Sequence, residues 1–173
     1  MTIYTLFQYV VRWIAPIMVF TAEDAWTAFN KENFSIHLEK YLIPVANWKN
    51  SEVAEHIEKV KSVRRVVNTA LEIARKDKLI GSSLQAKVTL FAPNEMLYTK
   101  DLEFWEEITI VSRFEISSDS EAPETAFVSD ELPQVKVVVS LADGEKCERC
   151  WKITEVDEDK VCDRCRKVLK NIV

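Results

Sequence analysis

The sequence is poor in glycine and histidine. Its 173 residues contain two glycines, Gly81 and Gly144, and two histidines, His37 and His56. Two isolated glycines cannot form the glycine-rich loop that cradles a nucleotide phosphate. The histidines lie far apart in the sequence, and no serine or cysteine nucleophile pattern stands near either of them. The sequence therefore predicts no catalytic residues.

Long apolar runs and a net positive charge are missing too. Arg12 interrupts the apolar first twenty residues, and residues 2–20 also contain threonine, glutamine and proline. These interruptions argue against a signal peptide and against a membrane span. The formal net charge of −5 excludes a uniformly basic nucleic-acid binder. We therefore expect a cytoplasmic protein without membrane contact.

Charge is distributed unevenly along the chain. Residues 50–93 contain eight lysines and arginines against five acidic residues, whereas residues 94–134 contain two against eleven. An acidic surface repels a polyanion. We therefore expect the acidic stretch to be solvated and to face away from any nucleic acid.

Residues 1–30 show the periodicity of two apolar helices. Apolar residues form a broad stripe up to Ile17, and Pro16 is expected to end the first helix. Thr21, which precedes two acidic residues, is expected to cap the second helix. Residues 34–48 lack helical periodicity and are interpreted as a connector. Because two such apolar helices need partners, we expect the chain to be cut from a longer protein in which Met1 is not the native start.

The middle of the chain alternates between helical and strand patterns. Residues 51–78 carry apolar side chains at three- and four-residue steps, which predicts one long helix. The other predicted elements are strands at 84–92, 108–116 and 135–141, a short helix at 94–107 and a loop at 117–134. This order of elements predicts a small α+β module. Four tryptophans are expected to be core or packing residues: Trp13, Trp26, Trp48 and Trp105.

The four cysteines form two pairs with the same spacing. Two residues separate Cys147 from Cys150 and Cys162 from Cys165, and eleven residues lie between the pairs. This is the ligand pattern of a four-thiolate zinc site, which is closed and therefore structural. Two disulfides are an alternative, but the sequence carries no mark of secretion, and intracellular thiols stay reduced. A redox CxxC occurs singly. We predict one zinc ion per chain, bound by these four cysteines.

Basic residues crowd both cysteine pairs around one tryptophan. One interpretation is that the cations only offset the charge of about −2 that zinc and four thiolates carry together. The other is that they form a cationic surface with an aromatic ring on which an unpaired RNA base stacks. The predicted RNA-binding residues are Arg149, Trp151, Lys152, Arg164, Arg166 and Lys167.

Three blocks of sequence resemble one enzyme family, in that family's order. Residues 12–17 (Arg-Trp-Ile-Ala-Pro-Ile) and 20–26 (Phe-Thr-Ala-Glu-Asp-Ala-Trp) resemble the closing helices of the anticodon-binding bundle of class I tRNA synthetases. Residues 79–86 (Leu-Ile-Gly-Ser-Ser-Leu-Gln-Ala) resemble a later segment of isoleucyl- and valyl-type enzymes. Residues 144–151 and 161–165, which include the cysteines, resemble the C-terminal zinc knuckles of bacterial isoleucyl-tRNA synthetases. Together the blocks cover nearly the whole chain.

The resemblance implies the C-terminal region of an isoleucyl-tRNA synthetase, an enzyme that joins isoleucine to its tRNA using ATP. It also implies zinc binding by the four cysteines and two partners: the anticodon arm of isoleucine tRNA and the remainder of a synthetase expected to be monomeric. The family's His-Ile-Gly-His and Lys-Met-Ser-Lys-Ser motifs do not occur in this sequence. This part is therefore expected to be inactive alone and to bind no ATP.

The expected fold is α+β in three parts. Residues 1–48 would be the last helices of an anticodon-binding bundle with a connector, residues 49–142 the small α+β module, and residues 143–173 the zinc-binding tail. A structural tail that braces the synthetase without touching RNA is the alternative function. A related knuckle closes DNA glycosylases of the formamidopyrimidine type, but these need an N-terminal proline nucleophile, and this chain opens with Met1-Thr2.

Overall fold

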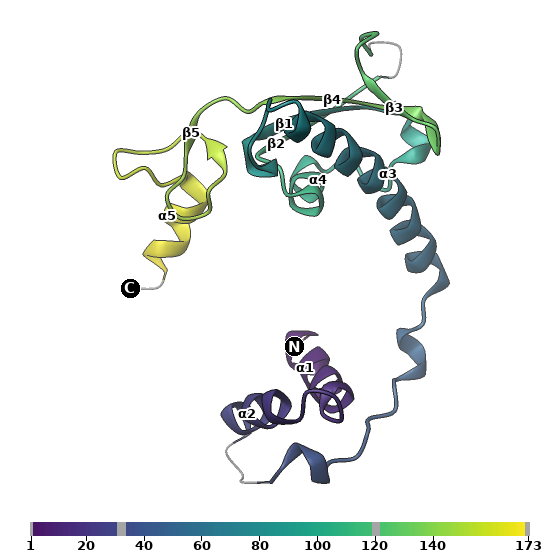
Figure 1. Cartoon of the computed structure of the whole chain (residues 1–173), viewed down its shortest axis with the longest axis vertical. Coiled ribbons are helices and arrows are strands. Elements are labelled where there is room, and N and C mark those ends of the chain that lie inside the picture. Colours follow the sequence, from purple (N-terminus) through teal and green to yellow (C-terminus); the bar gives the residue numbers. More distant parts are fainter. Residues whose placement is uncertain (1, 31–33, 119–121, 172–173) are drawn as a thin grey trace. The chain divides into compact units, whose positions relative to one another are not determined.

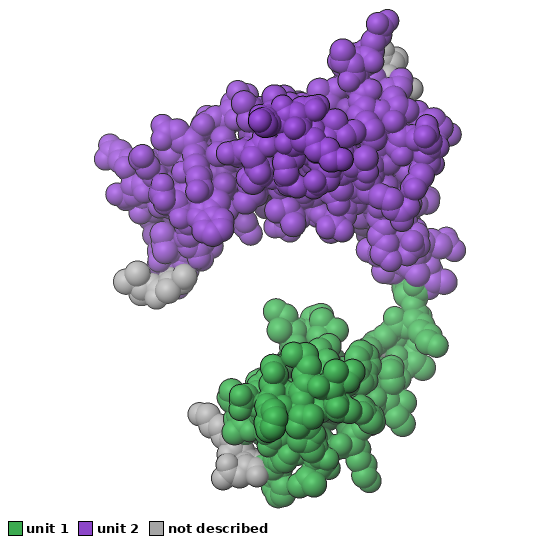
Figure 2. Space-filling model, in the orientation of Figure 1, with its two compact units in different colours: residues 1–50 green, residues 51–173 purple. Residues whose placement is uncertain are grey.

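The chain folds into two compact units. The computed structural model describes residues 2–30, 34–118 and 122–171, and the units comprise residues 1–50 and 51–173 (Figure 2). Each unit has a hydrophobic core of its own. Across these described ranges, no helix combines the length and the apolar character needed to cross a membrane.

The first unit is a pair of helices followed by a connector. Its elements are α1 (Thr2–Ile14), α2 (Val19–Phe29) and two 3-10 turns, Ile36–Leu38 and Ala46–Trp48. As predicted, α1 ends before Pro16, whose ring clashes with a preceding helical turn. The predicted cap of the second helix is wrong: α2 begins earlier, with Met18 at its cap position, and Thr21 lies inside the helix.

A buried tryptophan organises the core of the first unit. The indole N–H of Trp26 donates to the Phe34 carbonyl at 2.9 Å, which ties α2 to the connector. The Arg12 guanidinium lies 4.7 Å from the centre of the Trp26 ring and donates to Glu39 at 2.8 Å. A buried cation is costly unless it is paired. The Arg12–Glu39 pair therefore holds α1 on the same connector.

Much of the apolar surface of this unit remains exposed. Trp13 and Trp48, which were expected to be core or packing residues, are not in the core, since each exposes 53% of its surface. Both rings still contact Tyr9, at centroid distances of 5.8 and 5.4 Å. Other large exposed side chains of α1 and α2 include Ile3, Leu6, Val10, Val19 and Phe20.

The second unit is built around a four-stranded sheet with the order β2–β1–β4–β3. Its strands are β1 (Ala86–Phe91), β2 (Arg113–Ser117), β3 (Phe127–Ser129) and β4 (Leu132–Leu141). Strand β1 runs parallel to β2 and antiparallel to β4, and β3 is antiparallel to β4. Helices α3 (Ser51–Lys76) and α4 (Leu102–Thr109) pack on one face of this sheet (Figure 1). The predicted α+β class is confirmed.

Alternation along the strands explains the core of this sheet. Val88 and Leu90 of β1 are fully buried, and their cross-strand neighbours are Phe114 of β2 and Val137 of β4. Trp105 of α4 stacks on Phe114 with a centroid distance of 5.8 Å. The apolar face therefore continues from the strands into both helices, as the alternating sequence pattern predicts.

Three element predictions in the second unit need correction. The predicted helix 94–107 is a 3-10 turn (Asn94–Met96) followed by α4, and α4 continues through Thr109, where a strand was predicted. The β-branched Thr109 is accommodated because its hydroxyl donates to the Trp105 carbonyl at 2.6 Å. Strand β3 lies within residues 117–134, which were predicted to be a loop. Residues 119–121 of that segment lie outside the described residues.

The chain continues from β4 into a small substructure. Its elements are the hairpin strands β5 (Glu145–Lys146) and β6 (Ile153–Thr154) and helix α5 (Asp163–Lys170). We call residues 145–170 the knuckle and residues 51–141 the sheet module. Gly144 links them with a φ of +120°, and a Cβ at this position would lie 2.6 Å from the Thr154 backbone. Glycine is therefore required where the chain enters the knuckle.

Candidate metal centre and nucleic-acid interface

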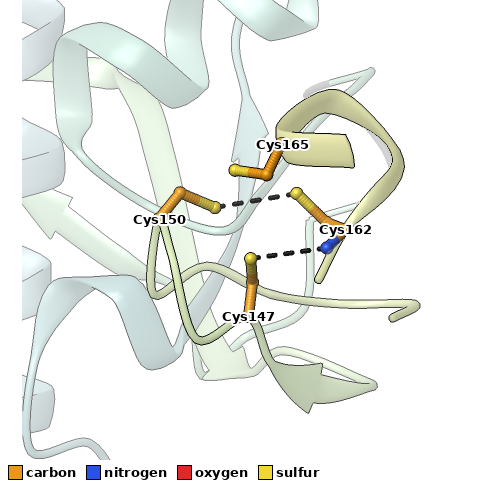
Figure 3. A group of neighbouring side chains, drawn as sticks. All are labelled: Cys147, Cys150, Cys162 and Cys165. Atoms are coloured by element: carbon orange, nitrogen blue, oxygen red, sulfur yellow. Dashed lines mark hydrogen bonds between the residues drawn. The ribbon is translucent and has the colours of Figure 1, made fainter. Parts of the chain in front are cut away.

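The four cysteines converge from two turns of the knuckle (Figure 3). Cys147 and Cys150 belong to the turn between β5 and β6, and Cys162 and Cys165 stand at the start of α5. Their four sulfur atoms all lie within 4.8 Å of one another. All four are free thiols, so neither of the alternative disulfides is formed among these described residues.

Backbone hydrogen bonds shape and join the two turns. In the first turn, the Cys147 N–H donates to the Lys152 carbonyl and the Trp151 N–H donates to the Cys147 carbonyl, both at 2.9 Å. The Glu148 N–H donates to the Lys160 carbonyl of the second turn, also at 2.9 Å. Trp151 and Lys160 have φ values of 67° and 56°. Left-handed backbone is disfavoured for residues with a Cβ, so the surrounding bonds must hold both turns closed.

The pKa values of the thiols differ because their environments differ. Burial alone would raise the pKa of Cys147, but N–H donation to its sulfur from Cys150, Cys162 and Arg149 lowers this pKa to about 6. Burial raises the pKa of Cys150 to about 12, and it also raises the pKa of Cys162. One thiolate therefore forms readily, whereas four adjacent thiolates require a cation among them.

The donor set fits a zinc ion. Sulfur atoms about 2.3 Å from a tetrahedral zinc lie about 3.8 Å from one another, and Cys150 and Cys162 Sγ are 3.7 Å apart. A tetrahedral set of soft thiolates suits zinc. Four protein ligands leave no coordination position for water. A metal at this site would hold the two turns together and would perform no chemistry.

The N-terminal half of the chain matches a known protein family. A family model described as the anticodon-binding domain of tRNA ligase matches residues 1–90, which is more than half of the chain. The chain belongs to this family.

Curated relatives extend the similarity of this anticodon-binding domain beyond residue 90. An isoleucine–tRNA ligase of Brucella abortus is 40% identical over 155 residues, which cover 88% of this chain and 16% of the relative. An isoleucine–tRNA ligase of Thermoanaerobacter sp. is 36% identical over 179 residues, which cover 95% of this chain and 19% of that relative. An isoleucine–tRNA ligase of Agrobacterium fabrum is 39% identical over 150 residues, which cover 86% of this chain and 15% of that relative. The chain thus spans less than a fifth of these relatives, and the expected resemblance to isoleucyl-tRNA synthetases is confirmed.

Three of the basic residues predicted to bind RNA lie on α5 of this anticodon-binding family member. Each has an acidic neighbour: Arg164 has Glu107 at 3.7 Å, Arg166 has Asp157 at 2.6 Å and Asp159 at 2.5 Å, and Lys167 has Asp163 at 2.6 Å. The Asp157 carboxylate accepts the Val161 N–H at 2.9 Å, and this bond together with Arg166 lowers its pKa. The Arg164 and Lys167 pairs are exposed and therefore weak, so these two cations can exchange an acidic partner for a phosphate. Arg166 is half-buried between two carboxylates and is less free to do so.

The cations of the first turn are placed differently. Lys152 points to α4, where it pairs with Glu106 at 2.8 Å, and the two side chains are only 22% and 15% exposed. Arg149 donates to Cys165 Sγ at 3.6 Å. Both side chains therefore contact the protein itself, and the structure does not gather all six predicted residues into one open surface.

Trp151 is the single aromatic residue in the sequence of the knuckle, and its indole is exposed. It exposes 59% of its surface, and the Lys146 ammonium lies 5.6 Å from its ring centre, within the range of a cation–π contact. Lys146 was absent from the predicted set, although its position directly before Cys147 was a usable signal. Glu106 and Ser112, which contact the knuckle from the sheet module, were also missed, because no local pattern links residues so distant in sequence.

Proposed function

We propose that the chain is the C-terminal, anticodon-side part of an isoleucine–tRNA ligase, and that its zinc-held knuckle contacts the anticodon arm of isoleucine tRNA. The whole enzyme would attach isoleucine to tRNA using ATP. The family match, the relatives' names and the four-cysteine cluster support this proposal. As part of it, we propose a monomeric, cytoplasmic parent enzyme.

The exposed ring of Trp151 carries the RNA-binding half of the proposal. A turn fixed by metal ligands holds this ring in a defined position, so little entropy is lost when a base stacks on it. Such stacking contributes about 1–3 kcal/mol per base. Lys146 lies beside the ring and adds the positive charge that a nucleotide phosphate requires.

The remaining residue assignments are part of the same proposal. Zinc would be bound by Cys147, Cys150, Cys162 and Cys165, one ion per chain. RNA contacts would come from Arg149, Trp151, Arg164, Arg166 and Lys167, whereas Lys152 would stay paired with Glu106. The proposed division remains residues 1–48, 49–142 and 143–173.

A substitution at Trp151 tests the RNA contact directly. In the zinc-loaded chain, Trp151→Ala should weaken binding of an isoleucine tRNA anticodon stem–loop by about 1–3 kcal/mol, whereas Trp151→Phe should retain most of the affinity because it keeps a stacking ring. Zinc content and thermal midpoint are measured on the same samples. Equal affinity of the alanine variant, with zinc retained, would contradict an RNA contact at this ring.

The alternative is that the knuckle braces the synthetase without touching RNA. This alternative is favoured by the Lys152–Glu106 pair and by the ion pairs that the α5 cations form with acidic residues of the same chain. The triple variant Arg164→Ala/Arg166→Ala/Lys167→Ala separates the two functions. Each phosphate contact that is lost should flatten the salt dependence of RNA binding by about one unit, whereas a brace predicts unchanged affinity and slope.

The proposed assignment also predicts that this chain performs no chemistry alone. The two signature motifs of the catalytic fold are absent from its sequence. Isoleucine-dependent exchange of pyrophosphate into ATP should therefore stay at background for the purified chain. Exchange that survives repeated purification would contradict the assignment.

A further inference from the structure

A buried serine connects the knuckle to the sheet module. The Ser112 hydroxyl donates to the Leu84 carbonyl at 2.5 Å and accepts the Ile153 N–H at 2.7 Å. The Ser112 N–H donates to the Ala86 carbonyl at 3.2 Å. Because the hydroxyl proton is used toward Leu84, its lone pair faces the knuckle. One side chain therefore joins the segment before β1, the start of β2 and strand β6.

A largely buried ion pair stands beside this serine. Lys152 directly precedes Ile153, and its ammonium donates to Glu106 of α4 at 2.8 Å. Water and salt screen such a pair less than a surface pair, and loss of either partner leaves an uncompensated buried charge. Two consecutive knuckle residues are thus bound to two different elements of the sheet module.

The exposed Arg164–Glu107 pair, at 3.7 Å, also crosses this seam between the knuckle and the sheet module, and cavities interrupt the rest of the seam. Cavities of about 440 and 350 Å³ flank the Ser112–Ile153 bond, and both are lined by Ser112, Arg113, Thr154 and Glu155. Among the described residues, the apolar core of the sheet module and the cysteine cluster form separate clusters. The orientation of the knuckle therefore depends on a few polar contacts and not on a shared apolar core.

We propose that Ser112, Glu106 and Lys152 form a latch that holds the knuckle and the sheet module as one rigid body, and that this latch positions Trp151 for its RNA contact. The positioning role rests on the proposed function. Lys152 and Ile153 follow Trp151 immediately in the chain, so any rotation at the seam moves the indole. Ser112 and Glu106 act through the latch as positioning residues and do not themselves contact RNA.

Relaxation measurements on the zinc-loaded full chain test the latch. In the unaltered protein, backbone amide ¹⁵N relaxation should give one rotational correlation time for the knuckle and the sheet module. Ser112→Ala/Glu106→Gln should give the knuckle a shorter correlation time while one zinc ion per chain is retained. Ser62→Ala/Glu58→Gln makes the same two substitutions on α3, away from the knuckle, at a half-buried and an exposed position, and should leave the tumbling of the knuckle unchanged. Separate tumbling in the unaltered protein, or shared tumbling in the latch variant, would overturn the proposal.

Binding of the anticodon stem–loop tests the positioning role. The latch variant should bind about tenfold more weakly than the unaltered chain although Trp151 and zinc are present, because the contact is no longer preorganised. Unchanged affinity in the latch variant, together with weakened binding by Trp151→Ala, would overturn the positioning role. If Trp151→Ala also binds normally, the proposed RNA contact at this ring is wrong, and the relaxation data alone decide for or against the latch.

Discussion

The sheet module and the knuckle are stabilised by different physical means. In the sheet module, valines of α3, alternate residues of three strands and Trp105 form one continuous apolar core. In the knuckle, the buried residues are Cys147, Cys162 and Cys165, with Val156 and Val161 only partly buried beside them. The first region can draw on the hydrophobic effect, whereas the second consists largely of polar surface around four sulfur atoms.

This difference is the reason to propose a bound metal for the knuckle and none for the sheet module. A segment as short as residues 145–170 cannot bury enough apolar surface to offset its conformational entropy. A structural metal would replace the missing core, since its binding free energy would also be folding free energy. Stability of the sheet module should therefore be independent of metal, and stability of the knuckle should depend on it.

Metal removal should produce the largest effect. A chelator, or Cys162→Ser, should unfold the knuckle and leave the sheet module folded, because zinc binding supplies on the order of 10 kcal/mol in such sites. Amide spectra recorded with and without zinc should lose dispersion only for residues 145–170. A protein that is purified without chelator and contains no zinc, or a knuckle spectrum that is unchanged in Cys162→Ser, would contradict this prediction.

Removal of a core side chain should give the converse result. Trp105 is fully buried against Phe114, so Trp105→Ala should destabilise the sheet module by about 3–5 kcal/mol. Urea unfolding followed at sheet residues measures the loss, and zinc content should stay at one ion per chain. Trp151→Ala, at an exposed ring, is the matched control and should change the free energy of unfolding of the sheet module little.

Much of this contrast could be predicted from the sequence, because its signals are local. The paired cysteine spacing predicted a cluster that the structure assembles within 4.8 Å. The three- and four-residue apolar steps predicted α3 nearly to its ends, alternation predicted β1, and a strand was also predicted within β4. Each of these patterns involves residues that are close in sequence. Each can therefore be recognised without knowledge of the tertiary structure.

The features that were missed depend on contacts distant in sequence or on competing local preferences. The β-branched Ile108 and Thr109 favour a strand, yet the Asp101 cap and the packing of Trp105 extend α4 through them. Trp48 was expected to be a core or packing residue from its place in the connector; it packs on Tyr9 but lies on the surface of the first unit. The latch joins residues about forty positions apart, which no periodicity could reveal.

A glycine substitution sharpens the comparison with an effect of intermediate size. Gly144→Ala introduces a Cβ at positive φ, 2.6 Å from the Thr154 backbone, and strain of this kind costs about 1–3 kcal/mol. The loss should appear as weaker zinc binding, measured by competition with a chromophoric chelator. Gly81→Ala is the control in the sheet module: its Cβ would meet only the end of the Gln85 side chain, at 3.1 Å. Equal zinc affinity for Gly144→Ala and the unaltered chain would contradict the prediction.

The smallest effect comes from the same substitution made once in each region. Lys78, two residues beyond the end of α3, has a φ of 60°, and Lys160, in the second turn of the knuckle, has a φ of 56°. Glycine adopts this conformation without the Cβ penalty of about 1–2 kcal/mol, although its greater freedom in the unfolded chain offsets part of the gain. We therefore expect each lysine-to-glycine variant to gain about 0.5–1 kcal/mol.

The two variants should report that gain through different measurements. Lys78→Gly should raise the free energy of unfolding of the sheet module in urea and leave zinc affinity unchanged. Lys160→Gly should tighten zinc binding by up to about fivefold, since folding and metal binding are one equilibrium there, and leave the urea midpoint of the sheet module unchanged. If either gain appeared in both measurements, the two regions would unfold as one cooperative body. The few polar contacts of the latch would then couple their stabilities as well as their orientation.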